Sequence, residues 1–356
     1  MEPDRWKSMT SIVQDLQEQK RRRAKKVIAA TLLFLIIALA AYLVLLGQGA
    51  VKMSPIRVLE VLNGGGTARE IAVVWDLRLP VALATVIVGA ALGIAGSWTQ
   101  TMARNPLASP DILGVASGAS VMVVLGTVTL RPEWSENVPD FWWRAGLAIV
   151  GAVAVIAVLT FLGGVGTNDK IVLIGFALSL MLQAAVSYLL LKGRILQAAQ
   201  AQMWLAGSTG FVRMDAVCLL LASLAPFLIL GLWVSRDLPL LAHDDISASM
   251  LGVNVQRVRT VLLYAATGVA AVVVSVVGPI GFVALLAPHL GKIVARSGTA
   301  SPLVSAAAGS ALLGVCAVIA GFIPSNAPVG AVSSAIGGIA LIGLVMGKSR
   351  KGIGHA

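Results

Sequence analysis

Residues 78–119 read RLPVALATVIVGAALGIAGSWTQTMARNPLASPDILGVASGA. The stretch opens with a charged turn at Arg78 and continues as an apolar segment rich in glycine and alanine. It breaks at the sequence NPLASP (105–110) and enters a second apolar segment through Gly114 and Gly118. In a bilayer, such proline and glycine breaks persist only where protein or a water-filled cavity covers the freed backbone groups. We therefore expect membrane helices that border a pathway rather than a plain anchor.

The composition excludes an ordinary soluble domain. The chain has 356 residues, of which 58% are hydrophobic and only 12% are charged, whereas soluble domains carry about 25% charged residues. Its apolar runs approach the roughly 20 residues that a membrane helix needs. We predict an all-α polytopic membrane protein with about ten transmembrane helices, at residues 27–47, 80–102, 112–130, 145–163, 171–191, 216–235, 258–277, 281–295, 302–323 and 328–347.

The basic residues predict the orientation. Eight of the 27 Lys and Arg residues precede Val27, as expected for the cytoplasmic flank of a first membrane helix. We predict a basic cytoplasmic tail at 1–26, a transmembrane domain at 27–347 and a second cytoplasmic tail at 348–356. Both termini are then cytoplasmic, and the first tail contacts anionic membrane lipid. Nucleic-acid binding is not expected, because no second basic patch with interleaved aromatic residues follows.

The acidic residues bear on the energy source. All 16 Asp and Glu residues lie at or before Asp245, and none lies near the middle of a predicted span. Ion-coupled transporters usually need carboxylates inside the membrane, so the absence of acidic residues from the middle of the predicted spans argues against ion coupling. The run from Gly343 to Ser349 is one residue too short for a phosphate-binding loop, so ATP and Mg are expected on a separate ATPase chain. We expect no cofactor, metal or catalytic residue in this chain, and Cys218 and Cys316 lack metal-ligand spacing.

Several segments carry a family resemblance. The RLP opening at 78–80, Asn105-Pro106 in NPLA, and LGVASGA at 113–119 closely resemble the signature of the FecCD family. Those proteins are the membrane permeases of bacterial ABC importers for iron-siderophores, haem and cobalamin. Weaker matches lie at 204–208, 248–252 and 278–289. The resemblance implies a type II ABC importer permease fold in the inner membrane, with an ABC ATPase dimer and a substrate-binding protein as partners.

The resemblance also implies where the binding protein docks. It assigns docking to Arg78, whereas Val81 replaces the family's second arginine. The chain has no arginine between Arg296 and Arg350, where the family has a third. We expect pairing with a second FecCD-type permease that supplies more of the docking charge; a heterodimer is favoured over a homodimer.

Three further roles come from the resemblance. The loop 236–260 is expected to dock the ATPase through a short helix and a glycine turn, with Asp244 and Asp245 capping the helix. Asn105-Pro106 and Pro288-His289 are expected to be structural, the latter at a helix break or a subunit contact. The assigned residues are Gly166, Thr167 and Asn168 for the cytoplasmic gate, and Ala248, Leu251 and Gly252 for ATPase coupling.

The cargo is open at this point. A ferric iron-siderophore complex is favoured because it is the commonest cargo of the family, with haem and cobalamin as alternatives. An ion-coupled secondary transporter and a membrane scaffold that uses the basic tail are the interpretations from other classes. No residue pattern identifies the ligand directly.

Overall fold

The computed structural model describes residues 3–49, 51–128, 132, 135–163, 169–242, 244–323 and 327–352. In these ranges every regular element is a helix, which confirms the predicted all-α fold. The helices are α1 (Pro3–Gly47), α2 (Pro55–Leu62), α3 (Ala68–Ala72), α4 (Leu79–Met102), α5 (Val115–Val128), α6 (Asp140–Gly163), α7 (Asp169–Lys192), α8 (Ile195–Leu205), α9 (Met214–Val234), α10 (Leu238–Leu241), α11 (Asp245–Met250), α12 (Val255–Val277), α13 (Val283–Ala295), α14 (Pro302–Phe322) and α15 (Val329–Gly352).

The predicted spans correspond to ten apolar helices in the described part of the chain. Seven are long and apolar enough to cross a membrane, and three shorter ones are α5, α13 and the Val329–Gly343 part of α15. With 14 residues in α5 and 13 in α13, each is only about 20 Å long, against a hydrocarbon core of about 30 Å. Each follows one of the proline and glycine breaks, so the breaks shorten these helices.

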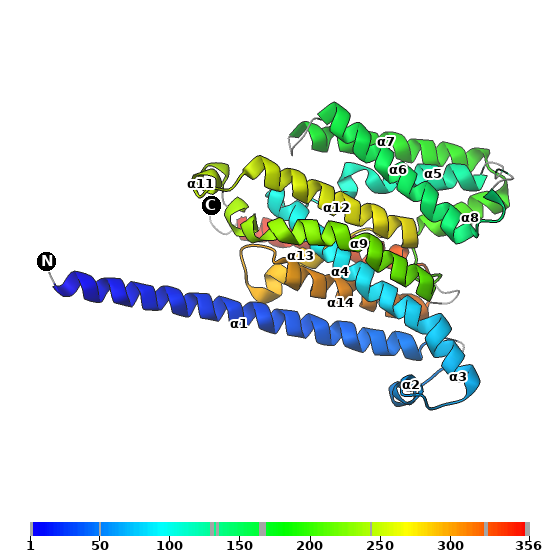
Figure 1. Ribbon diagram of the computed structural model, residues 1–356, viewed down its shortest axis with the longest axis horizontal. Coiled ribbons are helices and arrows are strands. Elements are labelled where there is room, and N and C mark those ends of the chain that lie inside the picture. The colour runs from blue at the N-terminus through cyan, green and yellow to red at the C-terminus, as the bar shows by residue number, and fades with distance from the viewer. Residues whose placement is uncertain are drawn as a thin grey trace.

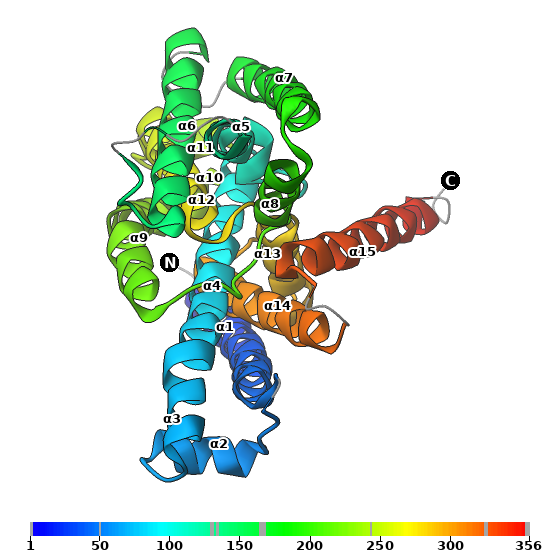
Figure 2. The same cartoon turned by 90° about the vertical axis from the view of Figure 1, so that its right-hand side faces the viewer.

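Helix α4 runs through the middle of the bundle and packs against α14, α13, α12 and α9 (Figure 2). Its glycines allow the close approach. A Cβ on Gly89 would lie 2.5 Å from the carbonyl oxygen of Gly309 in α14, and a Cβ on Gly96 would lie 1.7 Å from that of Ala284 in α13. Since no side chain fits at either crossing, these glycines let the helix backbones pack tightly.

Buried polar side chains on α4 find partners on neighbouring segments. The Thr85 hydroxyl lies 2.9 Å from that of Thr209, and the Gln100 amide donates to the carbonyl oxygen of Leu285 at 2.8 Å. Thr85 and Gln100 are both at most 2% exposed. Such bonds matter in an apolar environment because an unpaired polar group has no water to compensate it.

Helix α1 has 45 residues and extends well beyond the rest of the molecule at its amino-terminal end (Figure 1). It is continuous through the predicted boundary between residues 26 and 27, and residues 17–26 are exposed. The amino-terminal end, the carboxy-terminal end and α11 lie at one end of the molecule, whereas α2, α3 and α8 lie at the other (Figure 1). An even number of membrane crossings brings both termini to the same side, so this placement agrees with the ten predicted spans.

Candidate functional site

Three interrupted segments from distant parts of the chain meet at one junction. They are Trp204–Ser208 at the end of α8, Gly278–Gly281 before α13, and the start of α15. The Ser208 amide donates to the Val277 carbonyl at 2.8 Å, and the Gly330 amide donates to the Gly207 carbonyl at 2.9 Å. Backbone amides and carbonyls of the broken segments thus form hydrogen bonds with one another, as expected where protein covers a break.

A cavity of about 390 Å³ borders this junction. Its lining includes Pro279, Ile280 and Gly281, the apolar Ala116, Val186 and Leu205, and six polar side chains. The polar side chains come from the segment after α4, from α5 and from α7: Asp111, Ser117, Ser120, Ser179, Gln183 and Ser187. The Ser117 and Ser179 hydroxyls lie 2.9 Å apart and join α5 to α7. These polar side chains can solvate a polar cargo inside a chain that is otherwise strongly apolar.

These polar side chains were missed by sequence reasoning. Ser179, Gln183 and Ser187 recur at a spacing of four residues, so they lie on one face of α7. Large apolar residues cover other positions of the same helix, including Met181, which is more than half exposed. A polar stripe along an apolar span was the signal that could have identified this face. Figure 2 shows α15 projecting away from the bundle, with α7 and α8 on the same flank.

A second cavity, of about 630 Å³, lies at the end of the molecule that carries α2 and α3. Arg78 and Val81 both line it. The Arg78 guanidinium donates at 2.7 Å to the carbonyl of Leu46, in the last turn of α1, and also donates to the carbonyl of Val51. The half-buried Arg78 side chain therefore joins α4 to the end of α1. Its docking role stays a prediction.

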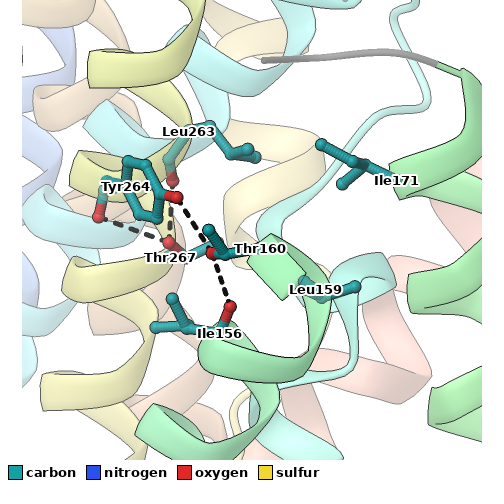
Figure 3. A pocket seen from close by; sticks show the side chains of 7 residues that line it. All are labelled: Ile156, Leu159, Thr160, Ile171, Leu263, Tyr264 and Thr267. Atoms are coloured by element: carbon teal, nitrogen blue, oxygen red, sulfur yellow. Dashed lines mark hydrogen bonds between the residues drawn. The ribbon is translucent and has the colours of Figure 1, made fainter. Parts of the chain in front are cut away.

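The predicted gate residues Gly166, Thr167 and Asn168 lie outside the described residues. The two flanks of this connection meet α12 around a small cavity, which Figure 3 shows from close by. The Thr160 hydroxyl near the end of α6 lies 2.9 Å from the Tyr264 hydroxyl on α12. Ile171, near the start of α7, lines the same cavity. The α6 end of the connection is therefore held on α12, and the α7 end borders the same cavity.

The predicted coupling loop contains α10, α11 and the start of α12. Ala248 is fully buried and anchors α11 to the body, whereas Leu251 is 66% exposed. Gly252 ends the helix in the left-handed region, at φ +86°, where glycine is favoured. Sequence reasoning missed the two other apolar side chains that α11 exposes, Ile246 and Met250, which are 71% and 82% exposed.

Asp244 caps α11 as predicted. Its carboxylate accepts a 2.7 Å hydrogen bond from the Ser247 amide, and the bonds from Ser247 hold the pKa of Asp244 below its usual value. The same role was expected of Asp245. That expectation is wrong, because Asp245 is the first residue of the helix and its carboxylate pairs with arginines instead.

The two motifs that were predicted to be structural lie in different kinds of segment, Asn105-Pro106 in a turn and Pro288-His289 in a helix. Asn105 forms a turn, in which its side-chain oxygen accepts from the Leu107 amide at 2.9 Å. Pro288 lies inside α13, so the expectation of a helix break at Pro288-His289 is wrong, whereas the alternative of a subunit contact stays a prediction. The break lies upstream, between Gly278 and α13. A proline inside a helix frees carbonyl groups one turn back, and Gln100 donates to one carbonyl there, that of Leu285.

Residues 33–347 match the profile of the FecCD transport family. The chain belongs to this family. It is 34% identical over 317 residues to the ferric enterobactin transport system permease protein FepG of Escherichia coli K12, covering 86% of this chain and 92% of FepG. It is 31% identical to the hemin transport system permease protein HmuU of Yersinia pestis, covering 88% and 94% of the two chains.

The fold of this FecCD chain also matches a solved structure. That structure is described as an inward-facing conformation of a putative metal-chelate type ABC transporter. The match has a TM-score of 0.74 at 22% identity and covers 91% of this chain and 99% of the other. The predicted permease fold is thereby confirmed, and the chain is a multi-pass membrane protein.

Proposed function

We propose that this chain is the permease subunit of an ATP-driven ABC importer that carries ferric siderophore complexes across the bacterial inner membrane. The observation that carries the proposal is the junction of three interrupted segments beside a polar cavity, in a chain of the FecCD family. A junction of this kind gives a polar cargo a surface inside an apolar bundle. Relatives named for siderophore transport, FepG and the probable permease YfhA of Bacillus subtilis, support this cargo.

The energy source is assigned to a separate ATPase dimer. The chain has no acidic residue after Asp245 and no complete phosphate-binding loop. In the described residues no group of three or more His, Cys, Asp and Glu could hold a metal ion. The coupling helix α11, with its exposed Ile246, Met250 and Leu251, is the surface we assign to the ATPase. Both termini are then cytoplasmic, since they lie at the same end as α11 (Figure 1).

The second permease subunit is proposed to be a related but different chain. FepG and FepD of Escherichia coli are both named as permease proteins of the ferric enterobactin transport system, and this chain resembles both at 34% and 33% identity. FecC and FecD are likewise two permease proteins of one Fe(3+) dicitrate system. A heterodimer also accounts for the docking arginines that this chain lacks. A homodimer remains the alternative.

A haem cargo is the second candidate, because HmuU is named for hemin. To decide between these cargoes, the chain is tagged and extracted together with its native partners. Mass spectrometry identifies the partners, and the complex is reconstituted in liposomes. Radiolabelled ferric enterobactin, ferric hydroxamate, ferric dicitrate and haemin serve as probes. ATP-driven uptake of a ferric chelate together with a co-purified ATPase supports the proposal, and uptake of haemin alone changes the cargo.

Two controls separate the other classes of function. The same liposomes are given a proton or sodium gradient without ATP, and gradient-driven uptake contradicts the ABC assignment in favour of an ion-coupled transporter. Deletion of residues 1–26 is expected to leave most transport intact. If the deletion abolishes a cellular role while transport persists, the membrane scaffold gains support instead.

A further inference from the structure

One carboxylate at the end of the molecule that carries α11 pairs with two arginines from different elements. Asp245, the first residue of α11, accepts a hydrogen bond from the Nη2 atom of Arg104, just beyond the end of α4. Its two carboxylate oxygens also accept bonds of 2.9 and 3.0 Å from the guanidinium of Arg259 in α12. We call Asp245, Arg104 and Arg259 the α11 clamp. The clamp joins α11 to α4 and α12, which are separate in the chain.

Both arginines are held for this contact. The Arg259 side chain is only 17% exposed and meets Asp245 with two parallel bonds, the geometry that gives an Arg-carboxylate pair its strength and direction. Arg104 donates its Nε–H to the Leu241 carbonyl at the end of α10 at 3.1 Å. Its backbone lies in the left-handed region at φ 47°, which is uncommon for a residue with a Cβ. The Leu241 carbonyl thus helps to fix the Arg104 guanidinium, whereas the Arg259 guanidinium is held by its bonds to Asp245 and by its low exposure.

The clamp is a polar connection between α11 and two helices of the bundle. A helix of six residues is too short to be stable alone, so its position depends on contacts with the body. Ala248 supplies an apolar contact on the buried side, while the exposed side carries Ile246 and Met250. A displacement of α11 without the clamp is opposed mainly by Ala248 and the chain connections. With the clamp, a displacement of α11 also pulls on α4 and α12 through the bonds of Asp245 to Arg104 and Arg259.

The two helices lead to the parts of the molecule assigned to transport. Five residues beyond Arg259, Tyr264 contacts Thr160 at the flank of the predicted gate (Figure 3). Beyond Arg104 the chain turns through Asn105 to Asp111, which lines the polar cavity. One carboxylate thus links the exposed apolar surface of α11 to both regions through short, named contacts.

We propose that Asp245 is a positioning residue that fastens α11 to α4 and α12, so that movement delivered to α11 by the ATPase reaches Thr160 on α6 and the polar cavity. This inference rests on the proposed function of the chain as a permease. The alternative is that the clamp is an ordinary surface ion pair, of the kind that contributes little. The alternative predicts no effect on the coupling of ATP hydrolysis to transport.

The test uses the whole complex in liposomes, with the ferric chelates above as probes. Asp245→Asn removes the charge, Asp245→Glu keeps it, and Asp244→Asn is the matched control, because Asp244 is the neighbouring acid and asparagine also caps helices. We expect Asp245→Asn to lower the cargo taken up per ATP hydrolysed by about fivefold or more, within the usual range of coupling between sites. Asp244→Asn and Asp245→Glu should stay within about twofold of the unchanged complex.

A double-mutant cycle separates positioning from a general loss of charge. If Asp245 acts through Arg259, Asp245→Asn combined with Arg259→Gln should cost no more than the larger single change. Equal losses in Asp245→Asn and Asp244→Asn, or uptake per ATP unchanged in Asp245→Asn, would overturn the inference. If Asp245→Asn does not assemble, Arg259→Lys replaces it, since lysine keeps the charge without the planar fork.

A measurement without cargo tests the position of α11 directly. Spin labels are placed at Ser247→Cys on α11 and Ile293→Cys on α13, both exposed, with Cys218 and Cys316 replaced by alanine. The distance distribution in the complex is expected to be narrow with Asp245 and clearly broader with Asp245→Asn. Identical distributions would overturn the clamp. If the unchanged complex shows no ATP-driven uptake, the proposed function fails while this measurement still decides the clamp.

Discussion

The amide nitrogen of Gly330, at the start of α15, lies 2.9 Å from the carbonyl oxygen of Gly207, at the end of α8. A Cβ on Gly330 would lie 2.3 Å from the carbonyl of Ala206, so only glycine allows this approach. The contact ties two segments more than 100 residues apart in the chain. It places the start of α15 against the broken segment before α13 and so forms the junction beside the polar cavity.

The junction should not tolerate a side chain at Gly207. This residue has φ +66°, and a Cβ there would lie 2.1 Å from the Pro279 carbonyl. Gly207→Ala is expected to destabilise the protein by about 2 kcal/mol or more and to abolish uptake. Thermal unfolding in detergent and uptake in liposomes measure both effects. Gly210→Ala is the control, because its Cβ would meet only the Ser208 hydroxyl, at 3.3 Å.

The crossing of α4 and α14 makes a second prediction. A Cβ on Gly93 would lie 2.0 Å from the carbonyl of Ser305, which is backbone and cannot move aside cheaply. We expect Gly93→Ala to separate the helices and lower stability by about 1–3 kcal/mol, seen as a lower melting temperature. Gly338→Ala in α15 meets no atom within 4 Å and should be neutral. Equal melting temperatures for both variants would contradict the close crossing.

The Tyr264 hydroxyl is predicted to steady the flank of the gate. Tyr264→Phe removes its bond to Thr160, whose hydroxyl keeps its bond to the Ile156 carbonyl at 2.8 Å. A loss of about 1 kcal/mol is expected, together with faster hydrogen exchange at the ends of α6 and α7. Tyr188→Phe in α7, where the tyrosine is 60% exposed, is the control. If exchange at these ends is unaltered in Tyr264→Phe, the contact does not hold the flank.

The polar cavity is predicted to carry cargo. Gln183→Leu keeps a similar side-chain size while removing a hydrogen-bonding group from the wall. Uptake should fall severalfold, by about 1 kcal/mol or more in effective affinity, while the melting temperature changes little. Gln202→Leu, on the exposed surface of α8, is the control. Full uptake by Gln183→Leu would place the path elsewhere.

Arg78 can be tested for two roles at once. Its bonds to the Leu46 and Val51 carbonyls predict that Arg78→Ala loosens the end of α1 and destabilises the protein by about 1–3 kcal/mol. The family resemblance predicts weaker docking of the binding protein. Melting temperature reports the first effect and binding of the purified binding protein reports the second. Arg69→Ala, an exposed arginine at the same end, is the control; unchanged docking in Arg78→Ala would leave only the structural role.

Much of the fold could be predicted from local signals. Each apolar run long enough for a bilayer appears as a helix, and the glycines of α4 lie at helix crossings as their spacing indicated. The end of α13 at Ala295 and the cap of α11 at Asp244 also lie where the sequence predicted them. The helix break was expected at Pro288, but α13 continues through this residue, and the Gln100 amide binds the Leu285 carbonyl in the preceding turn.

The candidate site was predicted only in part. The segments at 204–208 and 278–289 were singled out by the family resemblance, but nothing in the chain order indicated that they meet each other and the start of α15. The α11 clamp was missed entirely, because Arg104 and Asp245 are 141 residues apart. The stripe of Ser179, Gln183 and Ser187 was present in the sequence, yet its meaning depended on the cavity that it faces.

The sequence by itself determined that the chain is an all-helical membrane protein of this transport family, because the length of apolar runs, the charge asymmetry and the motifs are properties of neighbouring residues. Only the tertiary structure decided which broken segments cover one another, which side of α11 is exposed and which arginines hold Asp245. The physical reason is that backbone groups freed by a break, and charges at a helix end, must be satisfied by whatever groups packing brings within reach. Those partners lie at very different distances along the chain, from 14 residues between Asp245 and Arg259 to 141 between Asp245 and Arg104.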